Sequence, residues 1–211
     1  MKNLIIIGAG GMGRSLYNMA IGCHGYGTEF IIKGFLDDDV SQLDKFKGYP
    51  PILDTISNYV VQEDDVFTCS IGEVKTKFKL CSSIIKRGGE FITLIHEQAR
   101  VCNNVVLGKG SIVAPFCLVD CDTVVGEMCL LQSDAVIGHD CTIGSYTRID
   151  THVTLVAGTV IGDRVTIHTS AVINHKVKVD DEAIVGACSF VIRKVKSGTT
   201  VVGNPAKRLM E

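Results

Sequence analysis

The sequence has no excess of charge of either sign and no long hydrophobic run. Its 211 residues include 21 Lys and Arg against 23 Asp and Glu, which leaves a formal net charge of −2, and no block of basic residues stands out. That balance gives no sign of nucleic acid or an anionic membrane surface as a partner. No apolar stretch approaches the roughly 18–20 residues that a bilayer-spanning helix needs. We therefore expect no nucleic-acid binding and no membrane insertion.

Cysteine spacings typical of disulfide frameworks or zinc sites are also missing. The nine cysteines are an odd number and contain no C-x-x-C pair, so buried, reduced thiols are the favoured interpretation and no metal is expected. The first residues, MKNLIIIGAGGMG, run from a short apolar stretch into glycines rather than into a cleavage site. This pattern predicts a strand and not a signal peptide. Both features favour a cytoplasmic protein.

What the sequence does contain is a six-residue repeat. From residue 95 to residue 191 every sixth residue is aliphatic, without an insertion, and this holds at all seventeen positions. They are Ile95, Val101, Leu107, Val113, Val119, Val125, Leu131, Ile137, Ile143, Ile149, Leu155, Ile161, Ile167, Ile173, Val179, Val185 and Val191. Neither the 3.6-residue period of a helix nor the two-residue period of a strand produces this step.

Two other positions of the repeat are also restricted. The residue four after the aliphatic one is mostly small, as at Ala99, Ser111, Cys117, Thr123, Cys129, Ala135, Cys141, Thr147, Thr159, Ala171, Ala183 and Ser189. The residue one after it is often glycine, at Gly108, Gly126, Gly138, Gly144, Gly162 and Gly186. We expect the aliphatic and small residues to point inward and glycine to allow an unusual backbone conformation at the corner.

Three such steps make one triangular coil of 18 residues, and successive coils stack as parallel strands about 4.8 Å apart. The alternative, an ordinary β-sandwich, would instead show strands of irregular length with turn signals every 8–12 residues or so. The repeat therefore predicts a parallel β-helix in a second domain, residues 95–211.

Residues 1–94 do not follow the six-residue step and form a different domain. Their pattern predicts strands at 3–8, 30–39, 65–72 and 90–96, helices at 11–22 and 73–87, and a further helix between the second and third strands. Strands alternating with helices indicate an α/β domain with a small, Rossmann-like parallel sheet.

The segment GAGGMG follows the first strand and opens the first helix, so its backbone N–H groups suit an anion. Asp37 and Asp38 end the second strand, where an acidic residue can meet a ribose hydroxyl. Fewer than a hundred residues is short for a dinucleotide domain, so a single nucleotide, such as that of an activated sugar, fits better. Alternatively, the glycines only make a tight turn.

These features together resemble the bacterial sugar acetyltransferases of the PglD/NeuD type. The resemblance rests on the small GxGGxG domain, the hexapeptide repeats with the element IGHDCTIG, and the tail GTTVVGNPAKRL, and it covers essentially the whole chain. It implies a left-handed parallel β-helix, a homotrimer, acetyl-CoA as co-substrate, and a nucleotide-activated amino sugar as the partner that is acetylated.

The resemblance also implies the catalytic residues. The family's base and the acid that raises its basicity match His139 and Asp140. Independently of the family, an imidazole with a pKa near 6.5 suits proton removal from an attacking amine or hydroxyl at neutral pH. A neighbouring carboxylate favours the protonated imidazole and so strengthens it as a base. The other five histidines are expected to be ordinary solvated residues.

Binding residues are implied in the same way. Matching positions for acetyl-CoA are Arg148, often His in relatives, together with Thr169, Gly186 and Ala187. Several surrounding motifs differ from the family pattern, which weakens the side-chain assignments. For the sugar nucleotide, the matching positions are Gly10, Gly11, Met12, Asp37 and Asp38. Ser70, Ile71 and Gly72, at the end of the third strand, are expected to face the same crevice.

Three other functions are compatible with parts of this sequence. O-acetylation of a sugar such as sialic acid uses the same chemistry with a hydroxyl acceptor. A zinc hydratase of the γ-carbonic anhydrase type shares the β-helix, but it needs three converging histidines whose spacing is not found here. A non-catalytic protein that binds a nucleotide sugar would keep the fold without the activity.

Overall fold

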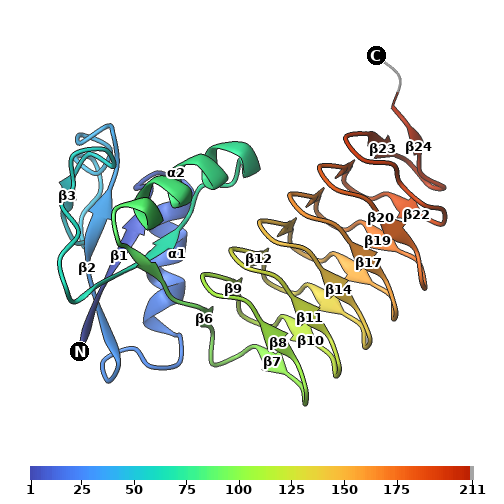
Figure 1. The fold of residues 1–211 in the computed structure, drawn as a ribbon, viewed down its shortest axis with the longest axis horizontal. Coiled ribbons are helices and arrows are strands. Elements are labelled where there is room, and N and C mark those ends of the chain that lie inside the picture. The colour runs from blue at the N-terminus through green and yellow to red at the C-terminus, as the bar shows by residue number, and fades with distance from the viewer. Residues whose placement is uncertain (210–211) are drawn as a thin grey trace. The chain divides into compact units, whose positions relative to one another are not determined.

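A computed structural model of the chain describes residues 1–209. The chain forms two compact units, Met1–Leu94 and Ile95–Glu211. The first unit has a five-stranded parallel sheet in the order β3-β2-β1-β4-β5 (Figure 1). Its elements are β1 (Lys2–Ile7), α1 (Gly11–Ile21), β2 (Phe30–Leu36), β3 (Ile52–Asp54), β4 (Asp65–Cys69), α2 (Val74–Lys86) and β5 (Glu90–Phe91). The predicted Rossmann-like sheet is confirmed.

The helix expected between the second and third strands is not formed. Residues 37–64 make turns and the short strand β3 instead. Pro50 and Pro51 lack the N–H groups that a helix interior requires, and the Pro51 carbonyl accepts a hydrogen bond from Phe35 N at 2.9 Å. The strand predicted at 90–96 is also divided, into β5 and β6 (Leu94–Ile95).

The second unit is a parallel β-helix with three faces (Figure 1). The first face contains β6, β9 (Ile112–Val113), β12 (Leu130–Leu131), β15 (Arg148–Ile149), β18 (Thr166–Ile167), β21 (Ile184–Val185), β23 (Thr200–Val202) and β24 (Lys207–Arg208). The second contains β7 (Arg100–Val101), β10 (Leu118–Val119), β13 (Val136–Ile137), β16 (Thr154–Leu155), β19 (Val172–Ile173) and β22 (Phe190–Val191). The third contains β8 (Val106–Leu107), β11 (Val124–Val125), β14 (Thr142–Ile143), β17 (Val160–Ile161) and β20 (Lys178–Val179).

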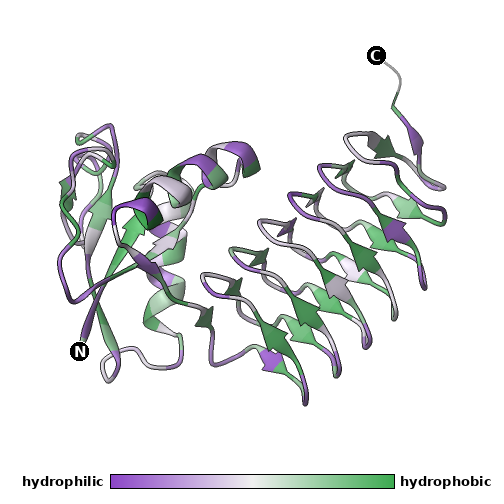
Figure 2. Ribbon diagram, in the orientation of Figure 1, coloured by the Kyte–Doolittle hydropathy of each residue, from purple (hydrophilic) through white to green (hydrophobic). Residues whose placement is uncertain are grey.

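Strands one coil apart pair in register, as where Leu131 lies beside Ile149. The repeat's aliphatic residues from Val113 onward are at most 2% exposed and form one continuous core. Figure 2 shows hydrophobic residues along the strands of each coil and hydrophilic residues at its outer turns. The prediction of buried thiols is confirmed for Cys117, Cys129 and Cys141, which lie in that core.

The reason proposed for the repeat's glycines is wrong. The residue with positive φ lies three positions after the aliphatic one at every corner from Asn104 to Cys188, and at only two of these corners is it glycine. Glycines such as Gly144 have ordinary φ and instead lie close to the next coil. A Cβ on Gly144 would come within 2.5 Å of Asp163 N. Close stacking of backbone, not a left-handed conformation, therefore requires glycine there.

Both helices begin next to the loops predicted to bind substrate. α1 begins after Gly10, and α2 begins after Glu73, whose carboxylate accepts hydrogen bonds from Lys75 N at 2.9 Å and Thr76 N at 2.7 Å. Neither helix has the length and apolar character needed to span a bilayer, considering residues 1–209.

Candidate active site

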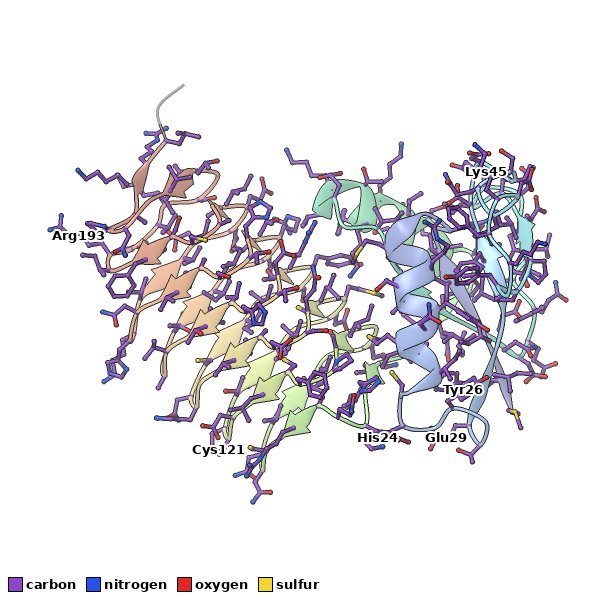
Figure 3. All side chains as sticks on the ribbon, turned by 180° about the vertical axis from the view of Figure 1, so that it is seen from behind. His24, Tyr26, Glu29, Lys45, Cys121 and Arg193 are labelled. Carbon is purple, nitrogen blue, oxygen red and sulfur yellow. The ribbon has the colours of Figure 1, made fainter. Side chains whose placement is uncertain are left out.

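His139 lies at the corner between the second and third faces, which we call the His139 corner (residues 120–122, 138–140 and 156–158 on three successive coils). Asp140 has a φ of 57° and makes the turn there, a conformation that Asp tolerates better than most residues. Its N–H donates to the Cys121 carbonyl on the preceding coil at 3.2 Å. Cys121 marks this corner in Figure 3. The turn of the coil thus sets His139 and Asp140 side by side on the surface.

The two side chains form the expected dyad. His139 Nδ1 lies 2.6 Å from Asp140 Oδ2, with the imidazole 53% and the carboxylate 67% exposed. In the neutral imidazole with Nδ1–H donated to Asp140, the lone pair lies on Nε2. The hydrogen bond with Asp140 raises the pKa of His139 above its ordinary value, and the negative charges of Asp120 and Asp122 add to this effect. The arrangement makes His139 a stronger base that can still reach a ligand.

The neighbouring coil has small residues at the corner next to His139. Ala157 and Gly158 occupy the corner on the next coil, where Gly158 N donates to the His139 carbonyl at 2.9 Å. Gly138 lies close against Ala157, since a Cβ on Gly138 would come within 2.8 Å of Ala157 N. No large side chain therefore occurs at these corner positions next to the half-exposed imidazole of His139.

The residues predicted to hold acetyl-CoA gather at a different corner, between the first and second faces. We call it the Asp150 corner (residues 132–134, 150–152, 168–170 and 186–188). Thr169 and Ala187 take the same position on successive coils and are exposed, Gly186 precedes Ala187, and Arg148 lies on β15 just before the corner. Four predicted residues are thus brought together along one edge of the coil.

Two residues that the sequence did not single out also belong to this corner. Asp150 is 4% exposed, and its carboxylate binds Arg148 and His168. His168 is therefore not the ordinary solvated histidine that was expected. The sequence did contain an indication of this contact, because Asp150 and His168 are 18 residues apart. Residues with that separation occupy the same position on successive coils and lie side by side.

One chain does not bring His139 and the Asp150 corner together. They lie on different edges of the triangular coil, with the second face between them. A face is one six-residue step, which spans up to about 20 Å of extended chain. An imidazole on one edge and a cofactor on the other can meet only with a contribution from another copy or a long ligand.

In the first unit, the predicted glycine loop lies at the carboxyl ends of β1, β2 and β4. Gly8 has a φ of 93°, and a Cβ on Gly13 would come within 2.0 Å of the Gly8 carbonyl oxygen. Ser70 is 5% exposed, and its hydroxyl donates to the carbonyls of Ile7 at 2.9 Å and Gly8 at 3.1 Å. Gly13 is thus required for packing α1 against the loop, and Ser70 holds the loop in place.

The carboxylates of Asp37 and Asp38 both accept hydrogen bonds from backbone N–H groups. Asp37 Oδ2 accepts a hydrogen bond from Ala9 N at 2.7 Å, which ties the glycine loop to the end of β2. Asp38 Oδ1 accepts from Ile56 N at 3.1 Å. Of the other predicted residues, Gly10 precedes α1, Gly11 and Met12 are its first residues, and Ile71 and Gly72 follow the end of β4. The loop is therefore fixed before any ligand arrives.

Among residues 1–209, no group of three or more His, Cys, Asp or Glu side chains is arranged to hold a metal ion. The imidazoles other than His139 and His168 have no carboxylate within ion-pair distance in that range.

Comparison with known proteins gives two matching family descriptions. Residues 3–84 match the PglD N-terminal domain, and residues 122–157 and 158–193 match the bacterial transferase hexapeptide (six repeats). The fold is similar to the acetyltransferase domain of PglB from Neisseria gonorrhoeae FA1090, with 27% sequence identity and a TM-score of 0.88 over 99% of this chain and 100% of that one. The chain thus combines a PglD N-terminal domain with bacterial transferase hexapeptide repeats, and it shares its fold with the PglB acetyltransferase domain over nearly its whole length.

Other members of the fold group are more distant in sequence. PerB from Caulobacter crescentus, in complex with CoA and GDP-perosamine, has 23% identity and a TM-score of 0.89 over 100% of this chain and 98% of that one. WeeI from Acinetobacter baumannii AYE has 24% identity and a TM-score of 0.73 over 99% and 100%. At this identity they support the fold alone. No curated protein matches the chain.

Proposed function

We propose that the protein transfers the acetyl group of acetyl-CoA to the amino group of a nucleotide-linked amino sugar. The observation that carries this proposal is the His139–Asp140 dyad, which a PglD/NeuD-type β-helix presents on an open corner. The same PglB domain, 27% identical to this chain, has also been solved in complex with acetyl coenzyme A.

In the proposed reaction the neutral amine of the sugar attacks the thioester carbonyl carbon. His139 Nε2 takes the proton that the nitrogen loses as the C–N bond forms. The tetrahedral intermediate then expels the CoA thiolate, and the proton on His139 returns to the sulfur. Such general-base catalysis typically contributes about 10²–10⁴-fold in rate. The carboxylate of Asp140 stabilises the imidazolium between the two proton transfers.

We place acetyl-CoA along the Asp150 corner, against Arg148, Thr169, Gly186 and Ala187. Support comes from their alignment on successive coils. They form a row parallel to the axis of the β-helix, and an extended pantetheine chain could lie along such a row. The exposed Thr169 and Ala187 leave backbone accessible there. Contacts through backbone do not depend on the residues that differ from the family pattern.

A homotrimer follows as part of the proposal. His139 and the Asp150 corner occupy different edges of one chain, so a ring of three copies would let the His139 corner of one subunit face the Asp150 corner of the next. A head-to-tail contact of this kind closes naturally into a cyclic oligomer. Each active site would then be shared between two subunits.

The first unit is proposed to hold the nucleotide of the sugar. The glycine loop presents backbone N–H groups at the start of α1, where phosphate binding is favourable, and Asp37 and Ser70 fix its shape. Gly10, Gly11, Met12, Asp38, Ile71 and Gly72 complete the proposed site. The cytoplasm is the proposed compartment, in line with the burial of the Cys117 and Cys141 thiols in the core of the coil.

The decisive experiment incubates the protein with acetyl-CoA and a panel of acceptors, and measures free thiol release. Nucleotide amino sugars should give turnover, and hydroxyl acceptors such as sialic acid should not. Replacing His139 with Ala should lower kcat by about 10²–10⁴-fold without a change in melting temperature.

A matched control is His175→Ala, because His175 occupies the same position two coils later but is followed by Lys176 instead of an acid. It should retain wild-type turnover. Thiol release with hydroxyl acceptors alone would establish the O-acetyl alternative instead, and no release with any acceptor would support a binding protein.

A further inference from the structure

Asp150 is a buried carboxylate at a position that should face solvent. It follows Ile149, which points into the core, so Arg148 and Asp150 both point outward from the first face. Asp150 is nevertheless only 4% exposed. Its side chain is covered by the side chains that bind it.

Both carboxylate oxygens are fully engaged. Arg148 donates from Nε to Oδ1 at 2.5 Å and from an Nη atom to Oδ2 at 3.1 Å, so the ion pair is bidentate. Gln132 Nε2 also donates to Oδ1, at 2.5 Å, and His168 Nδ1 lies 3.0 Å from Oδ2. Gln132, Asp150 and His168 occupy the same position on three successive coils, which makes Asp150 the centre of the cluster.

Stacking the coils does not require such a cluster. Asp163, at the corner between the third and first faces, links two coils more simply, because its Oδ1 accepts a hydrogen bond from Ser145 N at 2.7 Å. The Asp150 carboxylate binds three side chains instead. A buried carboxylate is unfavourable unless it is paired, so the observed arrangement fixes a guanidinium and an imidazole next to each other.

The Arg148 guanidinium and the His168 imidazole both remain accessible to a ligand. The side chains of Arg148 and His168 are 28% and 41% exposed, whereas that of Asp150 is 5% exposed. His168 directly precedes Thr169, and both side chains bind Asp150 on the edge where acetyl-CoA is placed. A guanidinium already held in a fork loses less freedom when it binds a ligand than a mobile one does.

We propose that Asp150 is a positioning residue, which holds Arg148 and His168 in a fixed arrangement to bind the carbonyl oxygens of the acetyl-pantetheine chain. This inference rests on the proposed function. Asp150 acts through Arg148 and His168 and does not itself touch the cofactor. Its effect should therefore fall on acetyl-CoA binding and spare the amino sugar.

The test is Asp150→Asn, which keeps the shape and removes the charge. We expect the KM and the calorimetric Kd for acetyl-CoA to rise about 3- to 10-fold, the range expected when a bound side chain must be immobilised. Both kcat and the KM for the amino sugar should stay within about twofold of wild type. The control Asp163→Asn removes a coil-bridging carboxylate at another corner and should leave all four values unchanged.

A double-mutant cycle separates positioning from a structural role. In an Arg148→Gln background, Asp150→Asn should add little further loss of acetyl-CoA affinity, because the group it positions is gone. An equal loss in both backgrounds would overturn the inference. If Asp150→Asn does not fold, Asp150→Glu keeps the charge, displaces it by one methylene, and should still weaken acetyl-CoA binding.

Binding of acetyl-CoA to the wild type distinguishes a failure of the proposed function from a failure of this inference. A wild-type protein that binds no acetyl-CoA would overturn the proposed function and this inference with it. A wild type that binds acetyl-CoA, with an Asp150→Asn variant that binds it equally well, would overturn the inference alone.

Discussion

The His139–Asp140 pair contributes little to folding because both side chains face water, and exposed ion pairs are weak. The folded protein raises the pKa of His139, so the small stabilisation from this pair is present below the unfolded pKa of about 6.5 and is lost as pH rises through the folded value. The pair is therefore better explained by chemistry than by stability.

This pKa shift predicts a pH effect on catalysis. A general base must be neutral, so kcat/KM should rise with pH up to a plateau above the raised pKa of His139. Replacing Asp140 with Asn removes the largest cause of the shift, and the rise should move to lower pH while the plateau falls, because the base is weaker. A full pH–rate profile measures both effects.

The control for that profile is Glu182→Gln. Like Asp140, Glu182 lies three residues after an inward aliphatic residue and has a positive φ, of 58°. It lies at the corner between the third and first faces, away from both proposed sites, and pairs with Arg164. Its profile should overlay that of the wild type. An Asp140→Asn profile that is merely scaled down, with no horizontal shift, would show that the carboxylate does not act on the pKa of His139.

Thiol reactivity should also follow position in the coil. Burial raises the pKa of the Cys117 thiol to about 12, while Cys188 is exposed at a corner. Only the thiolate reacts with alkylating agents. Timed iodoacetamide labelling read by mass spectrometry, without acetyl-CoA, should therefore modify Cys117 only after unfolding, and Cys188, which belongs to the Asp150 corner, before it. Early modification of Cys117 would contradict the buried core.

At the scale of elements, the corner glycines of the third face test how tightly the coils stack. Replacing Gly144 with Ala forces a Cβ to within 2.5 Å of Asp163 N and of the Gly162 carbonyl carbon. Overpacking of this kind typically costs about 1–3 kcal/mol of unfolding free energy. Urea unfolding measures it, with the exposed Thr142→Ala on the adjacent strand β14 as a control that should change little. Equal stability of the two variants would mean that the coils can separate locally at little cost.

The start of α2 provides a second test at this scale. Glu73 accepts hydrogen bonds from two backbone N–H groups, which would otherwise lack helical partners. Replacing Glu73 with Ala should lower stability by about 1 kcal/mol. The pKa of Glu73 is lowered in the folded state, first by Thr76, so the difference between wild type and variant should be present above the unfolded pKa and vanish as pH falls through the folded one. A difference that persists in acid would assign the effect to something other than the cap.

At the scale of the whole molecule, a shared active site predicts complementation between inactive subunits. Assayed at acetyl-CoA well below its KM, His139→Ala and Arg148→Gln should each give low activity alone. In randomly mixed trimers about one quarter of the interfaces combine an intact His139 corner with an intact Asp150 corner, so activity should return to roughly a quarter of wild type. Co-expression with two different affinity tags, followed by the thiol-release assay, measures this.

Light scattering gives the companion measurement, an assembly of about three times the 22.7 kDa chain mass. A monomer with full activity, or mixtures no more active than the separate variants, would place the whole site within one chain.

The sequence alone determined the β-helix, because a six-residue step of aliphatic residues can be buried only by a three-sided coil. It also determined the His139–Asp140 pair, since the two residues are adjacent in the chain and their geometry is local. The glycine loop was found for the same reason. These features depend on neighbours within a few residues or on a strict period.

Tertiary structure alone decided the rest. The left-handed corners carry residues as different as Phe116, Met128 and Asp140, because hydrogen bonds between coils and not residue type hold the backbone there. The cluster of Gln132, Arg148 and His168 around Asp150 joins residues from three coils, and its burial comes from side chains that cover one another. Contacts of this kind depend on how coils stack in space, and no local pattern in the chain encodes them.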